Sequence, residues 1–174
     1  FLIKKTAGRL NGWMSYTFSR TFLRTASNNV QGEAINKGAY YPADFDKPHN
    51  VNIIMNYQFS HRVSLSSNIV YSTGRPITLP LAQFNIGGAS SLFYSQRNQY
   101  RIPDFFRTDI SLNLEGNHKV KQKFHNSWSF GVYNLTGRQN AYSVYFVNNN
   151  GLVQGNQLSL FGTFIPFVTY NIKF

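Results

Sequence analysis

The chain has 174 residues, no cysteine, 17% aromatic residues and a formal net charge of +11. The lack of cysteine excludes a disulfide framework and a thiolate metal site. No apolar run approaches the ~18 residues of a spanning helix, so the sequence excludes a helical membrane protein but allows a spanning β-barrel, whose apolar residues alternate with polar ones.

The positive charge fits two kinds of partner, nucleic acid or a surface of anionic lipid or lipopolysaccharide phosphates. Lysine and arginine are scattered over the intervals between the predicted strands and do not gather on one element. We therefore disfavour nucleic acid. The chain opens FLIKKTAGRL, with neither an initiator methionine nor the apolar core of a secretory signal, so for an exported protein we expect a mature form or a fragment.

The first fifty residues predict a strand remnant, a turn, one complete strand and a long loop. Residues 1–5 have the pattern of a strand tail, and residues 6–9 form a tight turn. Residues 10–19 alternate apolar with polar side chains, which is the period of a strand. Residues 20–49 contain glycine, asparagine, aspartate and proline with no sustained period, so we expect a long loop there.

Residues 50–59 and 63–71 predict a hairpin with a short connection at residues 60–62. In both strands the apolar residues alternate with asparagine, glutamine or serine, and Ile54 is the exception. One face of the hairpin is therefore apolar, and the other is lined by amides and hydroxyls.

The second half of the chain continues this pattern of strands and connections. Residues 72–107 predict a second long loop, residues 108–114 a fourth strand, and residues 115–126 a basic connection of moderate length. A fifth strand follows at residues 127–133, and residues 134–156 form the third long interval.

Residues 157–174 predict one long last strand, because every second residue back from Phe174 is apolar, glycine or proline. Pro166 cannot donate to a ladder and belongs near a boundary, an edge or a bulge. Counting ~9–11 residues back from the end, the length of a spanning strand, places it near the outer interface. Residues 141–147 are rich in strand formers, and we expect them to pair with the upper part of this strand.

These elements predict an all-β protein, an antiparallel up-and-down transmembrane β-barrel. Every strand alternates, and the connections alternate long, short, long, moderate and long, as the two ends of such a barrel require. Six strands leave two bare edges, which hydrocarbon does not tolerate, so we expect the C-terminal ~6 strands of a larger barrel. The residues expected to face lipid are Val51, Ile53, Met55, Leu65, Ile69, Ile110, Leu112, Phe130, Val132 and Val168.

Several motifs resemble the TonB-dependent outer-membrane receptor family. The ending IPFVTYNIKF is similar to its last strand, and Tyr170, Ile172 and Phe174 match the assembly signal of outer-membrane barrels. Further matches lie along nearly the whole chain: GWMSYT at residues 12–17, YPADFDKPH at residues 41–49, TGRP at residues 73–76, RTDIS at residues 107–111 and YNL at residues 133–135.

This resemblance implies an active importer of an unidentified nutrient in the bacterial outer membrane. It implies a barrel of ~22 strands filled by an N-terminal plug, of the type with a carboxypeptidase-like N-terminal domain, energised by TonB through that plug. Residues 1–174 would be the C-terminal portion of the barrel domain, with long loops extracellular, the C-terminus periplasmic and the plug outside this chain. Implied partners are outer-membrane lipid and lipopolysaccharide, the rest of the barrel, the barrel-assembly machinery and a surface lipoprotein.

The candidate contact residues are few. Arg75 fits a loop-ordering role or contact with an anionic substrate, Asp109 would point into the lumen and pair with a barrel arginine, and Trp13 belongs to the lumen face. Asp44 and Asp46 form an Asp-x-Asp pair that favours a solvated turn over a Ca²⁺ site. The four histidines lack metal-ligand spacing, so we expect neither a cofactor nor an enzyme.

Three alternatives remain open at this point. One is a glycan or peptide importer that works with a surface lipoprotein. Another is a soluble all-β carbohydrate-binding module, which detergent dependence would separate from a barrel. The third is an outer-membrane barrel enzyme, which the absence of a Ser/His/Asp arrangement weakens.

Overall fold

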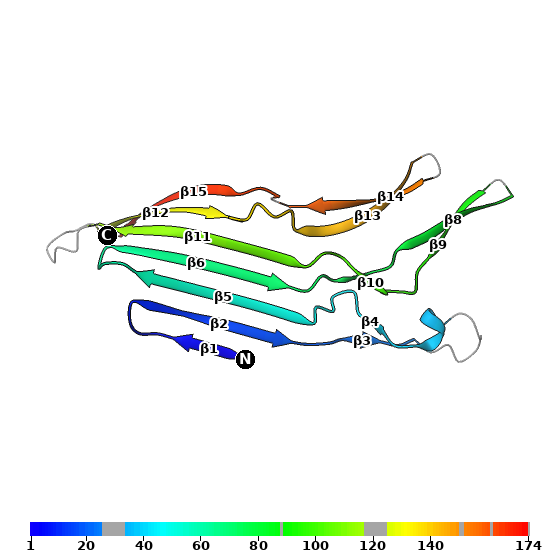
Figure 1. Cartoon of the computed structure of the whole chain (residues 1–174), viewed down its shortest axis with the longest axis horizontal. Coiled ribbons are helices and arrows are strands. Elements are labelled where there is room, and N and C mark those ends of the chain that lie inside the picture. The colour runs from blue at the N-terminus through cyan, green and yellow to red at the C-terminus, as the bar shows by residue number, and fades with distance from the viewer. Residues whose placement is uncertain (26–33, 88, 117–124, 150–151, 161, 174) are drawn as a thin grey trace.

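The computed structural model describes residues 1–25, 34–87, 89–116, 125–149, 152–160 and 162–173. Its main feature is a seven-stranded antiparallel sheet (Figure 1). In spatial order the strands are β1 (Leu2–Lys5), β2 (Leu10–Phe18), β5 (His49–Gln58), β6 (Val63–Ser72), β11 (Phe105–Glu115), β12 (His125–Tyr133) and β15 (Ile165–Lys173).

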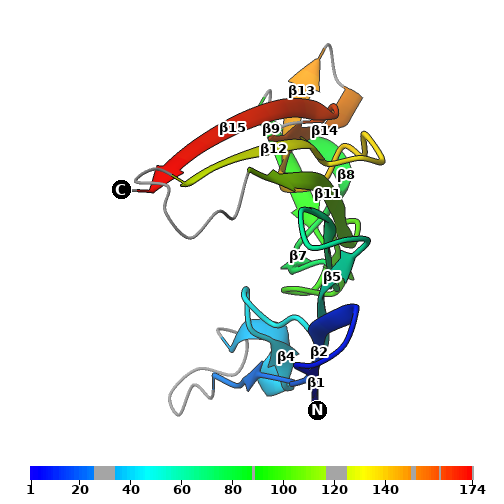
Figure 2. The ribbon, with the colours of Figure 1, turned by 90° about the vertical axis from the view of Figure 1, so that its left-hand side faces the viewer.

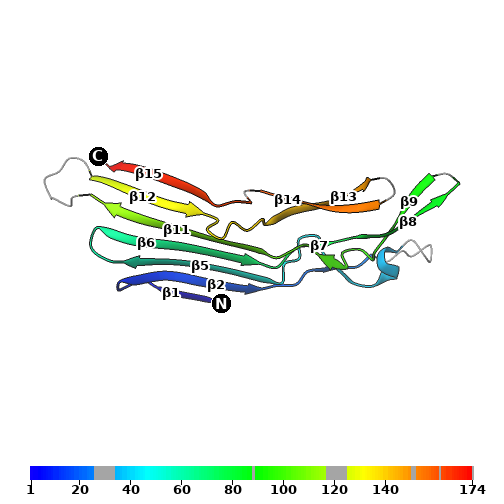
Figure 3. The ribbon, with the colours of Figure 1, turned by 45° about the horizontal axis from the view of Figure 1, so that its top comes forward.

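Four two-stranded ladders and one short 3₁₀ turn lie in the long connections, which leave the sheet at one end (Figures 1 and 3). The ladders pair β3 (Phe22–Leu23) with β4 (Tyr41–Pro42), β7 (Pro76–Ile77) with β10 (Tyr100–Arg101), β8 (Pro80–Ile86) with β9 (Ala89–Tyr94), and β13 (Ala141–Asn149) with β14 (Leu152–Ser159). The 3₁₀ turn η1 is Ile35–Gly38. The described part of the chain holds no helix long and apolar enough to span a membrane.

The prediction of an antiparallel all-β protein is confirmed, with small changes at the strand ends. The expected hairpin at residues 50–71 is β5 and β6, and the strand predicted at residues 108–114 begins earlier, at Phe105. Within the seven-stranded sheet, each strand pairs with the strand of that sheet that follows it along the chain, so the order is up-and-down as expected.

One prediction about the end of the chain is wrong. Residues 157–174 do not form one strand, because β14 ends at Ser159 and β15 begins only at Ile165. Gly162 lies within this break, and Pro166, the second residue of β15, removes a ladder donor. The expected partner is correct for the first part of residues 141–147, because Ala141 pairs with Ser159 and Val144 with Gln157. Residues 145–147 pair instead with residues 154–156.

The strand registers gather the apolar side chains on one face of the sheet. Ile53 lies opposite both Met14 and Ile69, and Phe130 lies opposite both Leu112 and Val168. Directly paired side chains point to the same face, so this apolar face extends from β2 to β15. It is exposed in the structure: the Val168 residue, for example, keeps 61% of its accessible surface.

The opposite face carries a chain of side-chain hydrogen bonds across four strands. Ser129 Oγ in β12 donates to Asn113 Oδ1 at 2.8 Å, and Asn113 Nδ2 donates to Ser66 Oγ at 2.9 Å. Ser66 Oγ then donates to Asn56 Oδ1 in β5 at 3.1 Å. Amides and hydroxyls therefore connect four strands across this polar face.

The sheet is curved. Viewed along the strands, it forms an open arc with β1 and β15 at its two edges (Figure 2). A groove of about 230 Å³ lies on the polar face and is lined from five adjacent strands, from Ile54 in β5 to Phe167 in β15. Five neighbouring strands reach one small groove only where the sheet curves towards it, so the polar face is the concave one.

Gly12 in β2 allows a close approach between two strands. Its φ is +150°, and an added Cβ would overlap the Ile54 carbonyl oxygen of β5. We expect Gly12→Ala to lower the unfolding free energy by about 2 kcal/mol, measured by thermal unfolding. Ser15→Ala in the same strand is the control, and equal melting temperatures for the two variants would contradict this role of Gly12.

Candidate binding site at the loop end of the sheet

The three long connections meet beyond one end of the seven-stranded sheet, which we call the loop end. They run through residues 19–48, 73–104 and 134–164. Among the described residues, the three buried apolar side chains, Tyr41, Ala43 and Ile102, all belong to these connections. The most enclosed part of the described protein therefore lies at the loop end and not against the sheet.

A buried carboxylate joins the first two connections. Asp46 is only 2% exposed, and its Oδ2 contacts Arg101 Nη2 and lies 3.3 Å from Arg20 Nε. Its Oδ1 accepts the Thr21 N–H at 2.7 Å. Arg101 Nη1 also donates to the carbonyl oxygens of Asp46 and Gly74, at 2.7 and 2.9 Å.

The expectation of a solvated Asp-x-Asp turn is wrong for Asp46, because Arg101, 55 residues away, covers it. Asp44 is exposed and pairs with Arg97 at 3.4 Å. The two carboxylates therefore point to different arginines, and the described residues contain no group of three or more metal-binding side chains.

The Asp46 carboxylate is ionised because of its partners. Burial by itself raises its pKa, but the hydrogen bonds from Thr21 and Arg101 and the charges of Arg20 and Arg101 outweigh burial, so its pKa lies below the ordinary value of 3.8. Folding therefore stabilises the charged form of this group.

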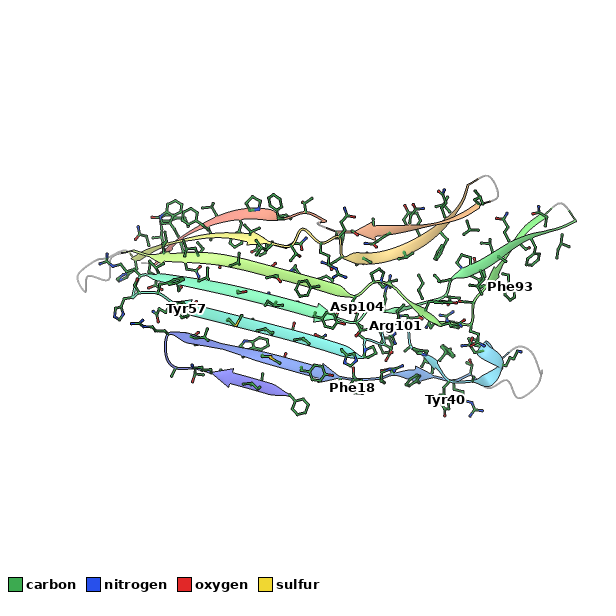
Figure 4. All side chains as sticks on the ribbon, viewed as in Figure 1. Phe18, Tyr40, Tyr57, Phe93, Arg101 and Asp104 are labelled. Carbon is green, nitrogen blue, oxygen red and sulfur yellow. The ribbon has the colours of Figure 1, made fainter. Side chains whose placement is uncertain are left out.

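Asp104, which Figure 4 labels near Arg101, links the second connection to the sheet. Its Oδ1 accepts the Gly74 N–H at 2.8 Å, and its Oδ2 accepts the Tyr71 hydroxyl at 2.7 Å. These two hydrogen bonds lower the pKa of the Asp104 carboxyl. Arg138 Nη2, from the third connection, donates to the Asp104 carbonyl oxygen at 2.9 Å.

Arg75 joins the second connection to the third. Its Nη2 donates to the Tyr142 carbonyl oxygen at 3.1 Å and to Ser143 Oγ at 3.2 Å, both in β13. The Thr-Gly-Arg-Pro element therefore lies where the sequence places it, between strand and loop, and its arginine orders the neighbouring loop.

A cavity of about 410 Å³ opens beside Arg75. Its walls come from all three connections and from the ends of β6 and β11. Its lining residues include Lys47, Ser72, Arg75, Ile102, Phe105, Tyr142 and Leu160.

Asp109 lies outside the loop end, within the seven-stranded sheet, on the polar face of β11. It is 8% exposed, and its Oδ2 pairs with Arg107 at 3.0 Å. Its Oδ1 accepts the Asn134 N–H at 2.9 Å, and Asn68 Nδ2 lies 3.5 Å from Oδ2. The arginine partner expected for Asp109 is thus on its own strand, and the carboxylate anchors the start of the third connection.

The other candidate residues lie away from the cavity. Trp13 is half-buried on the polar face, paired with Lys4 and Ile54. Tyr170 and Ile172 lie on the exposed apolar face of β15, and the Tyr170 ring lies 4.4 Å from that of Trp128. Phe174, the third residue of the expected assembly signal, lies outside the described residues.

Sequence reasoning missed the residues that hold the loop end together. Arg101, in the two-residue strand β10, and Asp104, just before β11, are isolated charges in the sequence. Asn98 donates to the Pro42 carbonyl oxygen at 2.8 Å. Asn140 exchanges two 2.9 Å hydrogen bonds with the Phe106 backbone. No spacing in the sequence marks these contacts, because they join residues from 27 to 56 positions apart.

The comparisons match the chain to no protein family, no curated protein and no solved structure.

Asp46→Asn tests the buried ion cluster. The variant leaves Arg101 and Arg20 without their shared carboxylate, so we expect a loss of about 2 kcal/mol, seen as faster protease cleavage within residues 19–48. Asp44→Asn, which removes an exposed pair with Arg97, should cost well under ~1 kcal/mol.

The same cluster predicts a pH dependence. Because the folded-state pKa of Asp46 is lowered, its stabilisation is complete above the ordinary pKa of 3.8 and is lost as the pH falls through the lowered value. The difference in cleavage rate between the wild type and Asp46→Asn should therefore shrink only below about pH 4. A difference that disappears already at pH 6 would contradict this assignment.

Proposed function

We propose that this chain forms part of the wall of an outer-membrane β-barrel, in an importer of the TonB-dependent receptor type. The observation that carries the proposal is the curved antiparallel sheet, whose convex face is apolar and exposed while its concave face is polar and hydrogen-bonded. An outer-membrane barrel needs this arrangement, with lipid outside and a polar interior.

The uncovered apolar face supports a barrel over a soluble sandwich. In a sandwich, a second sheet packs about 10 Å away on the apolar face. The other described strands form two-stranded ladders at the loop end instead. Exposed apolar surface of this extent marks an interaction with a membrane or a partner.

Strand length also supports the proposal. The six long strands have 9 to 11 residues each, and a tilted strand crosses the hydrocarbon layer in ~9–11 residues. The edges at β1 and β15 would pair with the remaining strands of the larger barrel, because unpaired backbone groups are costly in lipid.

In this proposal the loop end is extracellular and the end with the short turns is periplasmic. TonB would act through a plug, and the barrel-assembly machinery would recognise Tyr170, Ile172 and Phe174. The nutrient would pass along the polar face, and lipopolysaccharide would surround the apolar face.

A lysine substitution on either face of β5 tests the lipid contact. Ile53→Lys on the apolar face should cost ~2–4 kcal/mol near the bilayer midplane, because the charge would enter hydrocarbon. Asn52→Lys, at the neighbouring position on the polar face, should lower the unfolding free energy much less. Folded, membrane-inserted protein is measured in outer-membrane fractions, and equal yields for the two variants would contradict the lipid assignment.

Protease treatment of intact cells tests the orientation. We expect cleavage within residues 19–48, 73–104 or 134–164, since these connections would face the medium. The short turn at residues 60–62 should be cut only after the outer membrane is permeabilised. Cleavage confined to residues 60–62 in intact cells would reverse the proposed topology.

A further inference from the structure

The cavity at the loop end has two cations and no anion on its walls. Lys47 and Arg75 line it, and no lining residue is acidic. Neither cation forms an ion pair with a carboxylate in the described part of the chain. Arg101 and Arg20 pair with the nearby carboxylate of Asp46, and the charges of Arg138 and Arg101 act on that of Asp104, so cations outnumber carboxylates around the cavity. The cavity is therefore electropositive.

Two hydrogen bonds position the Arg75 side chain to bind an anion. Its Nη2 is fixed by the Tyr142 carbonyl oxygen and by Ser143 Oγ, which leaves its other N–H groups for a ligand. The Nε–H and Nη1–H groups can each donate a charge-assisted hydrogen bond to a carboxylate. Because the side chain is already ordered by the loop, little further entropy is lost on binding.

Much of the remaining wall is apolar. Ile102 is buried, and Phe105 and Leu160 also line the cavity. The volume of about 410 Å³ suits a small organic ligand. An inorganic anion would leave this apolar surface unfilled, so the wall favours an anion that carries an apolar body.

The position of the cavity favours a dissolved ligand over a lipid headgroup. Ser72 and Phe105 are paired with each other and line the cavity from the polar, concave face of the sheet. The exposed apolar face, where lipid would lie, is on the other side.

We propose that this cavity binds a small carboxylate with a compact apolar body, through Arg75 and Lys47. This site goes beyond the proposed transport function, because binding depends only on the loop end and can be measured on protein in detergent. Failure to bind would leave the lipid contact of β5 untouched, and failure of the membrane experiments would leave this site untouched.

The test is calorimetric titration of the intact protein in detergent with benzoate, with its neutral analogue benzamide, and with inorganic phosphate. We expect benzoate to bind at least tenfold more tightly than either of the others. Lys47→Gln and Arg75→Gln should each weaken benzoate binding about tenfold, by removing a charge-assisted contact. Lys47→Gln is the cleaner variant, because Arg75 also orders the loop.

Lys37→Gln is the matched control, since it removes an exposed lysine outside the cavity and should leave benzoate affinity unchanged. Equal binding of benzamide, or no binding of benzoate, would overturn the proposal. Phosphate binding as tight as benzoate would overturn the apolar part of the ligand class. Wild-type affinity in both cavity variants would show that benzoate binds elsewhere.

Discussion

The pairing register of the long strands determines which side chains share a face, and the other features of the sheet follow from it. Side chains alternate along a strand, so a slip of one residue in one pair would move a whole apolar row to the polar face. Ile53 would then leave Met14 and Ile69, and Ser66 would lose Asn113 and Asn56. The backbone ladder and the side-chain hydrogen bonds therefore specify the same register.

That register produces a sheet without a core of its own, so burial is concentrated at the loop end. There the enclosed groups are the Asp46 carboxylate together with Tyr41, Ala43 and Ile102. A buried carboxylate with two arginines adds little net stability, because desolvation offsets much of the attraction. Removing one partner is nevertheless costly, so the cluster makes any other arrangement of the first two connections unfavourable.

The strands were predictable because their signal is local, whereas the loop end was not. Alternation over ten residues is enough to place β5 and β6, and the serine and asparagine positions mark the polar face. The break between β14 and β15 was not predicted, because apolar and polar residues can alternate in the same way along one strand and along two successive strands of different sheets. The Asp46–Arg101 pair escaped because its partners are 55 residues apart and no periodic pattern connects them.

The chemistry of the cavity follows from how the loop end distributes its charges. Asp46 binds Arg101 and Arg20, and the charges of Arg138 and Arg101 act on Asp104, which also accepts a backbone N–H and a hydroxyl, so nearby cations offset both carboxylates. Arg75 is tied to β13 through neutral oxygens, which fix its position without cancelling its charge. A cation held by neutral partners keeps its attraction for an external anion, whereas one paired with a carboxylate loses most of it. The same hydrogen bonds that order the third connection thus leave a positive charge directed at the cavity.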